Sequence, residues 1–224
     1  MLTLHHLEYS QSFRTLWLLE ELGADYELEL YERDKKTLLA PTDYKALSPL
    51  GTAPVITDGE VVLAETGAIS DYILDAHPKN TLRPKAGHAD RTRYLFWFHA
   101  AQASLMPLML IETLFRIMRT RVPFFLRPFV ALITKAAQAG FIRPRLKALL
   151  DQAETDLSTA PWFGGDNFTA ADIMISYPLE SAQSRGLLTD AYPNCADWLE
   201  RATARPAFLR AQEKDGRSSR ILSL

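Results

Sequence analysis

Glu65 and Thr66 stand at the start of a predicted helix, where their side chains suit the binding of an amino acid group. A helix N-terminus presents unpaired N–H groups and a partial positive charge, so it attracts a carboxylate. The Thr66 hydroxyl and backbone supply further donors, and the Glu65 carboxylate can pair with a ligand ammonium. The alternative is that either residue simply caps its helix. The pair therefore predicts a site for the amino acid end of a ligand, or an ordinary cap.

The elements around this pair follow the order β-α-β-α-β-β-α. Residues 1–7 and 26–31 are predicted strands, and the second alternates apolar and acidic side chains. Between them a helix runs to Gly23, with Ser10 or Ser12 as its cap. Asp58-Gly59 predicts a hairpin turn, the strongest short-range signal for that structure. The other predicted elements are a short helix over 43–47, strands over 54–57 and 60–63, and a helix over 65–76.

Ala53 and Pro54 lead into the first strand of that hairpin. The order of elements resembles the thioredoxin fold, in which a cis-proline occupies this point. An X–Pro bond favours trans over cis by only about 0.5–1 kcal/mol, so a cis bond is expected here. The backbone N–H and C=O of Ala53 would then face outward and pair with an extended peptide, in the manner of strand addition.

Three segments together carry a more specific resemblance. They are Ser10-x-Ser12-x-Arg14 running into Leu16-Trp17-Leu18-Leu19-Glu20-Glu21, Ser48-Pro49-Leu50-Gly51-Thr52-Ala53-Pro54-Val55, and Ala64-Glu65-Thr66-Gly67-Ala68-Ile69. The combination resembles the cytosolic glutathione transferase family, particularly its bacterial and fungal members. The resemblance implies an α/β plus all-α architecture, with a thioredoxin-like glutathione-binding domain over 1–82 and an all-helical domain over 88–224 that forms the second-substrate pocket. It also implies glutathione as co-substrate, held by Thr52, Ala53, Pro54, Glu65 and Thr66.

Ser10 lies four residues before Arg14, where serine-type members of that family place their catalytic serine. A free thiol with a pKa of about 8.5 is mostly protonated at neutral pH. A hydrogen bond to a charged group contributes about 1.5–3 kcal/mol, which lowers a pKa by about one or two units. Tyr9 is the alternative donor, because other branches use a tyrosine, and Ser12 or backbone donors remain as further alternatives. Adjacent residues leaving a strand point to opposite sides, so Ser10 and Tyr9 are not expected to reach the same sulfur.

Cysteine usage limits the chemistry. No cysteine occurs in residues 1–82, so disulfide exchange by the first domain is excluded and the reactive thiol must arrive with the ligand. Cys195, the one cysteine of the chain, is expected to be a packed apolar residue. Thr52 departs from the family pattern, because many members have Lys or Gln there to hold the glycine carboxylate. Either binding is weaker or a lysine takes over, and the candidates are Lys35, Lys36 and Lys45.

The second domain is predicted to be helical over 88–119, 128–140, 144–158, 169–184 and 192–204. Thr169 and Asp172 predict a capping box, which explains both residues without chemistry. Residues 113–150 contain eight basic residues and no acidic one, with phenylalanines interleaved. Two interpretations remain open for this stretch: a membrane-surface or anionic-substrate face, or solvated arginines on helices that cover the substrate cleft. The histidines have no metal-ligand spacing, so no metal site is expected.

Charge and composition set the broad class. The net charge of −2 gives no reason to expect a nucleic acid partner. The absence of a signal-like start, the single cysteine and the broken apolar stretch 122–133 favour a soluble, cytoplasmic protein. Residues 1–82 are acidic and residues 83–224 basic, which is consistent with the homodimer that the resemblance implies. The expected activity is transfer of the glutathione thiolate to a small hydrophobic electrophile; the alternatives are glutathione-dependent peroxide reduction and a non-enzymatic binding module.

Overall fold

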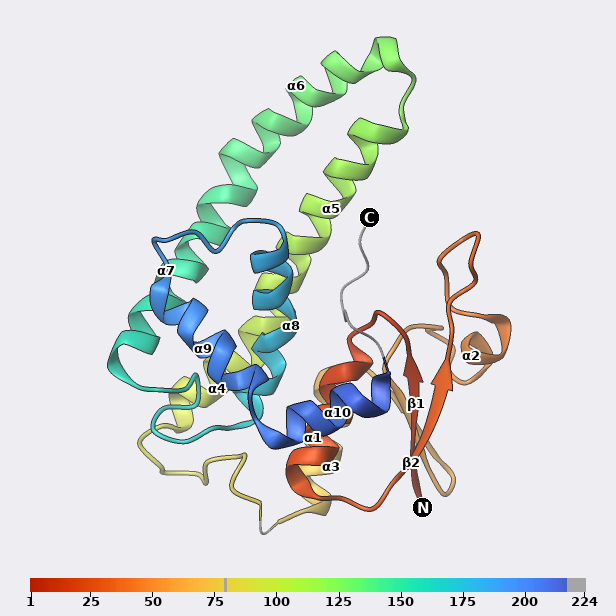
Figure 1. Cartoon of the computed structure of the whole chain (residues 1–224), viewed down its shortest axis with the longest axis vertical. Coiled ribbons are helices and arrows are strands. Elements are labelled where there is room, and N and C mark those ends of the chain that lie inside the picture. The colour runs from red at the N-terminus through yellow and green to blue at the C-terminus, as the bar shows by residue number, and fades with distance from the viewer. Residues whose placement is uncertain (79, 217–224) are drawn as a thin grey trace.

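A four-stranded mixed sheet forms the first part of the protein, in a computed structural model that describes residues 1–78 and 80–216 (Figure 1). The strands are β1 (Leu2–Leu7), β2 (Glu27–Tyr31), β3 (Val55–Asp58) and β4 (Val61–Ala64), in the order β2-β1-β3-β4. β1 pairs parallel to β2 and antiparallel to β3, and β3 pairs antiparallel to β4. Gly59 makes the β3–β4 turn with a φ of 58°, a conformation that glycine adopts without steric strain.

Three helices complete this part: α1 (Ser12–Leu22), α2 (Thr42–Ala46) and α3 (Thr66–Ala76). The element order predicted from the sequence is confirmed, with boundaries shifted by one or two residues. The predicted cap of α1 is wrong in detail. The helix begins at Ser12, and the residue before it, Gln11, makes no side-chain cap bond. Ser10 Oγ still accepts a hydrogen bond from the Ser12 N–H at 3.2 Å.

The second part is helical, as predicted, and its second helical stretch is longer than expected. α4 (Arg91–Ala100) continues through a π-helical turn, η1 (Ala101–Leu105), into α5 (Met106–Arg121). After the turn η2 (Phe124–Leu126), α6 (Arg127–Ala137) continues through a second π-helical turn, η3 (Gln138–Ile142), into α7 (Arg143–Thr159). Each π-helical turn ends two residues before a proline, Pro107 or Pro144. Proline lacks an N–H and its ring crowds the preceding turn, and local widening keeps the helix continuous at both positions. The sequence predicted this continuity through Pro107 but predicted a break before Pro144.

The remaining helices are α8 (Ala170–Ser184), α9 (Pro193–Thr203) and α10 (Pro206–Asp215). The predicted capping box at the start of α8 is confirmed, with Thr169 and Asp172 bonded in both directions. No helix was predicted after residue 204, so α10 is an omission. It buries Ala207, Phe208 and Ala211 on one face and packs against α1. The sequence contains only two brief signals for α10: a proline in its first turn and apolar residues one turn apart.

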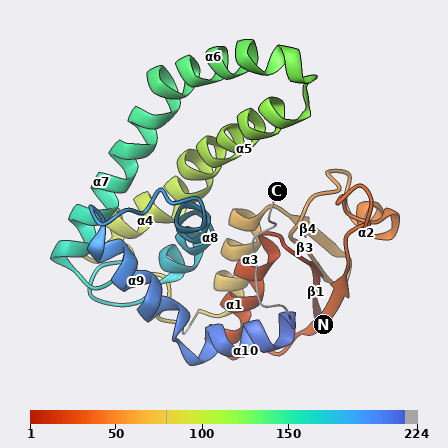
Figure 2. The same ribbon diagram turned by 45° about the horizontal axis from the view of Figure 1, so that its top comes forward.

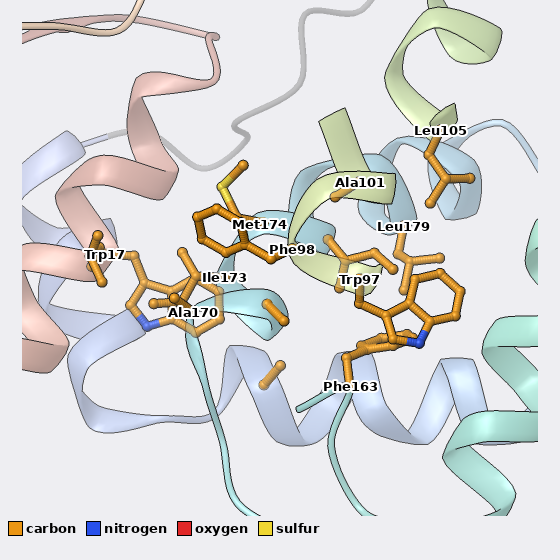
Figure 3. Close-up of a cluster of buried hydrophobic side chains, with 14 of the residues drawn as sticks. Trp17, Trp97, Phe98, Ala101, Leu105, Phe163, Ala170, Ile173, Met174 and Leu179 are labelled. Atoms are coloured by element: carbon orange, nitrogen blue, oxygen red, sulfur yellow. The ribbon is translucent and has the colours of Figure 1, made fainter. Parts of the chain in front are cut away.

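One hydrophobic cluster joins the two parts (Figure 3). Trp17 of α1 packs against Phe168 and Phe208, with ring centroids 5.5 and 4.9 Å apart. Ile173 and Met174 of α8 belong to the same cluster. The expected division into domains over 1–82 and 88–224 therefore describes two architectures that share a core.

Candidate active site

The start of α3 lies beside a buried arginine that the sequence motif contains. Thr66 is the first residue of α3 and is buried, whereas the Glu65 side chain before it is exposed. Glu65 has a φ of 77°, which strains a residue with a Cβ atom, and such strain concentrates at ligand-binding positions. The Arg14 guanidinium reaches to 3.5 Å from Thr66 Oγ1. A helix N-terminus and a guanidinium therefore favour an anion at the same point.

Arg14 is completely buried on α1 and is surrounded by neutral oxygens. It donates to the Met174 carbonyl at 2.7 Å, to Gln102 Oε1 at 2.9 Å and to the Gln11 side chain. Within residues 1–78 and 80–216 no carboxylate pairs with it, and its Nε has no hydrogen-bond partner. Burial lowers the pKa of Arg14 to about 10, so it remains a cation at neutral pH. A buried cation without a counter-charge is unfavourable, and a ligand carboxylate would relieve that cost.

The local sequence of α8 explains how Arg14 is held. Pro178 lies inside α8 and has no N–H to donate to the carbonyl four residues earlier, which is that of Met174. This carbonyl is therefore left for another donor, and Arg14 supplies it. Gln102, the second acceptor, lies in the π-helical turn η1. Helical segments of the second part of the protein, α8 and η1, thus fix Arg14 beside the start of α3 in the first part.

The expected peptide-pairing position has the anticipated backbone. The Ala53–Pro54 bond is cis. Ala53 lies two residues before Val55, the first paired residue of β3, so the strand ladder does not use its N–H and C=O. Thr52 beside it is exposed. Of the three candidate lysines, Lys45 lies beside Gly51, because a Cβ atom on Gly51 would approach Lys45 Cγ to 3.3 Å.

The Ser10 hydroxyl belongs to a buried hydrogen-bond chain. Its Oγ donates to the Leu7 carbonyl at 2.7 Å and lies 2.7 Å from Ser12 Oγ. Ser12 Oγ lies 2.9 Å from His6 Nδ1, and His6 Nε2 lies 2.7 Å from Asp215 Oδ1. The chain therefore runs from α10 to Ser10 through the first strand. Ser12 also donates to the Leu7 carbonyl, at 3.1 Å, so this carbonyl has two hydroxyl donors.

Tyr9 has a left-handed backbone, with a φ of 48°. Its side chain is half-buried, and its carbonyl accepts a hydrogen bond from Arg33 at 3.3 Å. Ser10 and Tyr9 therefore differ in surroundings, with the serine in a buried polar chain and the tyrosine nearer the surface. The tyrosine remains the second predicted donor.

Sequence reasoning missed Arg14, His6 and Asp215 as parts of this region. Arg14 had a usable signal, because it lies three and four residues before Trp17 and Leu18 on a helix whose residues 12–20 are all buried. A charged residue at such a position needs a partner. His6 and His5 have different partners: His5 contacts Tyr31 and Thr57, whereas His6 contacts Ser12 and Asp215. Asp215 had no signal, because its helix was not predicted.

The surroundings of Cys195 agree with the sequence analysis. Cys195 is buried, and burial first, then Glu154, raises the pKa of its thiol. It therefore behaves as a packed residue and not as a nucleophile. In the part of the chain that the structure describes, no group of three or more His, Cys, Asp or Glu residues could hold a metal ion.

A mixed four-stranded sheet joined through a shared core to an all-helical part defines the thioredoxin-like plus helical architecture. Family models match both parts: the glutathione S-transferase N-terminal domain over residues 1–75 and the glutathione S-transferase C-terminal domain over residues 135–201. The chain belongs to the glutathione S-transferase family.

Similar proteins extend the match over almost the whole chain. Glutathione S-transferase 3 of Schizosaccharomyces pombe is 31% identical over 214 residues, which cover 96% of this chain and 88% of that protein. Glutathione S-transferase 1 of Saccharomyces cerevisiae is 28% identical, covering 96% and 95%. The crystal structure of a glutathione S-transferase from Actinobacillus pleuropneumoniae has a TM-score of 0.79 at 33% identity, covering 96% of this chain and 93% of that one.

Proposed function

We propose that the protein is a glutathione transferase that binds glutathione at the start of α3 and transfers its thiolate to a small apolar electrophile. The observation that carries the proposal is the buried Arg14 guanidinium beside Thr66, unneutralised by any carboxylate within residues 1–78 and 80–216. Glutathione ends in a γ-glutamyl group with a carboxylate and an ammonium. The carboxylate fits Arg14 and the helix N-terminus, and the exposed Glu65 carboxylate fits the ammonium.

The rest of the tripeptide extends from this point along the start of β3. The Ala53 N–H and C=O pair with its cysteinyl backbone, in the manner of strand addition, and Pro54 fixes the approach. Thr52 is too short and neutral to hold the glycine carboxylate alone. Lys45 beside Gly51 supplies the positive charge that Thr52 lacks.

Ser10 activates the sulfur by redirecting its hydroxyl. In the free protein this hydroxyl donates to the Leu7 carbonyl. When the thiolate is present, Ser10 donates to it instead, and Ser12 remains as the donor to Leu7. A hydrogen bond to the charged form lowers the thiol pKa. The thiolate then attacks the electrophilic carbon, forms a sulfur–carbon bond and displaces the leaving group with its electron pair.

The test compares Ser10→Ala and Tyr9→Phe. Ser10→Ala is expected to raise the pKa of bound glutathione by about one or two units, because it removes a hydrogen bond of about 1.5–3 kcal/mol. Ultraviolet titration of the bound thiolate measures this shift, and turnover of a model electrophile measures its effect on kcat. Tyr9→Phe is the matched control. Parental pKa and kcat in both variants would rule out both hydroxyls.

The same measurements separate the transferase from its alternatives. A non-enzymatic module would bind glutathione without forming thiolate at neutral pH, and a peroxidase would turn over hydroperoxides in preference to alkyl or aryl electrophiles. The relatives carry transferase names, which favours neither alternative.

We also propose a homodimer in the cytoplasm. The first part of the chain carries an excess of acidic residues and the second an excess of basic ones, so two copies can pair unlike charges. Leu95 and Phe96 of α4 are exposed apolar residues that a second copy would cover. Analytical ultracentrifugation at low and high salt tests this: the dimer should be present at low salt and weaken as salt screens the charges.

A further inference from the structure

The hairpin of α5 and α6 places polar side chains inside. Arg119 of α5 donates from Nε to Thr134 Oγ1 of α6 at 2.6 Å, and it also bonds the Gln138 side chain. Gln138 in turn donates to Glu112 of α5. Thr134 and Gln138 are only 2% and 5% exposed. The seam between the two helices is therefore polar.

The outer surface of the same hairpin is apolar. Phe124 is 79% exposed, Phe129 is 67% exposed and Ile133 is 68% exposed. Other large apolar side chains of the hairpin are exposed as well: Leu110, Leu114, Met118, Phe125, Leu126 and Leu132. Phe125, Phe129, Leu132 and Ile133 follow helical spacing, so they share one face of the η2–α6 segment. In water, an amphipathic helix buries its apolar face, so the reversed arrangement predicts a covering partner.

The hairpin stands away from the rest of the protein. In Figures 1 and 2 its far end, where α5 gives way to η2 and α6, projects beyond the sheet and beyond the remaining helices. The principal packing partners of α6 are η2, η3 and α5, all of them within the hairpin or its continuation. A broad planar surface can therefore reach this end without meeting the sheet.

The charge of the hairpin selects the partner. Residues 113–150 contain no acidic residue and eight basic ones. Five of these lie in the hairpin, Arg116, Arg119, Arg121, Arg127 and Lys135, and the other three, Arg143, Arg145 and Lys147, lie in α7. Arg121 and Arg127 flank the apolar turn η2 on its two sides, and both are exposed. Exposed aromatic side chains next to basic ones match the boundary between acyl chains and anionic headgroups. Pairing with the hairpin of a second copy would instead bring like charges together.

We propose that the η2–α6 end of this hairpin docks on an anionic bilayer surface. Phe124, Phe125 and Phe129 enter the acyl boundary, and Arg121, Arg127 and Lys135 lie at the level of the phosphates. Continuous helices over 91–121 and 124–159 are long and apolar enough to cross a membrane. The polar seam and the packing of α4 and α8 around the core favour shallow docking at the surface instead. This inference does not depend on glutathione chemistry.

The test is co-sedimentation of the full chain with vesicles. Wild-type protein is expected to bind vesicles rich in phosphatidylserine and not vesicles of phosphatidylcholine alone. Phe125→Ser/Phe129→Ser is expected to weaken binding about tenfold or more, because each aromatic ring loses apolar burial. Arg121→Gln/Lys135→Gln is expected to weaken it about thirtyfold, because two charges at about 1 kcal/mol each are removed. The matched control is Leu39→Ser/Leu209→Ser, which removes two exposed leucines outside the hairpin and should bind like wild type.

Circular dichroism verifies that each variant is folded, and ultracentrifugation gives its oligomeric state. The proposal is overturned if wild-type protein ignores phosphatidylserine vesicles, or if the phenylalanine variant binds as well as the leucine control. It is also overturned if the phenylalanine variant loses a dimer that wild type forms, because a second copy would then cover this face. None of these outcomes bears on the proposed glutathione site.

Discussion

Arg14 is the side chain on which the proposed binding of glutathione depends most. It is buried without a counter-charge in the described chain, it is held by the Met174 carbonyl that Pro178 leaves free, and it lies beside the first residue of α3. A guanidinium fixed in this way is already oriented before the ligand arrives, so little side-chain entropy is lost on binding. The affinity for glutathione should therefore depend strongly on this residue.

Arg14→Met should raise the KM for glutathione by about tenfold to a hundredfold, which corresponds to a charge-assisted hydrogen bond of about 1.5–3 kcal/mol. Methionine fills similar volume and removes the buried charge, so folding is expected to survive. Steady-state kinetics and calorimetric titration of glutathione check the prediction. Arg91→Met is the control, because Arg91 donates to the Pro84 carbonyl in the connection before α4. An unchanged KM in Arg14→Met would mean that the carboxylate binds elsewhere.

At the scale of elements, α10 connects the end of the described chain to the site. Asp215 on α10 continues through His6 and Ser12 to Ser10, and all four side chains are buried. A second set of contacts holds the same helix to α1, where Arg210 and Lys214 bond Glu20 and Arg205 bonds Glu21. The helix α10, which was not predicted, thus supports Ser10, the residue predicted to activate the thiol.

Asp215→Asn should lower the free energy of unfolding by about 1–3 kcal/mol, because it replaces a buried charge-assisted bond to His6. Urea denaturation measures the change. Asp197→Asn on α9 is the control, since the exposed pair of Asp197 with Arg201 is worth about 0–1 kcal/mol. Equal losses in the two variants would show that the buried chain adds nothing to stability.

Glu20 predicts an acid dependence for the same helix. Burial alone would raise the pKa of Glu20, but hydrogen bonds from Lys214, Tyr26 and Arg210 prevail and lower it below its ordinary value of 4.5. A carboxylate whose pKa is lower in the folded state contributes stability above its unfolded pKa, and that stability is lost as pH falls through the folded value. Glu20→Gln should therefore be less stable than wild type at neutral pH and should show a smaller loss below pH 4.5. Urea unfolding on either side of that pH tests it, and a parallel pH profile in the two proteins would refute it.

At the scale of the whole molecule, one hydrophobic cluster spans the sheet-containing part and the helical part (Figure 3). Neither part can open without exposing Trp17, Phe168 or Phe208. The proposed glutathione site lies at the same junction, since Arg14 comes from one part and its acceptors, Gln102 and Met174, from the other. Stability and site geometry are therefore coupled through this boundary.

Trp17→Ala should lower the free energy of unfolding by about 3–5 kcal/mol, the usual loss for a buried aromatic ring. Because the core is shared, near-ultraviolet and far-ultraviolet circular dichroism should shift together in one transition. Leu30→Ala on β2 is the control, since that side chain is exposed. Two separate transitions in the variant would show that the parts unfold independently.

The sequence predicts the elements of the first part well because each has a local signal. Asp58-Gly59 predicts the hairpin of β3 and β4, and α3 begins directly after it. The alternation of apolar and acidic side chains predicts β2. The π-helical turns before Pro107 and Pro144 have no such signal. The helix that continues through Pro144 was predicted as two, because a proline predicts a break unless tertiary packing holds the helix together. Arg14, His6 and Asp215 were missed for a related reason: their contacts join residues that are up to 209 positions apart.

Glu65 has a further consequence for the balance between folding and binding. Its backbone adopts a φ of 77°, which glycine reaches without steric penalty. Glu65→Gly should therefore make the free protein more stable, by up to the 1–3 kcal/mol that such a conformation costs, while removing the partner of the ligand ammonium. At position 65, glycine would then give the more stable protein and glutamate the tighter binding of the ligand, so no single residue would be best for both.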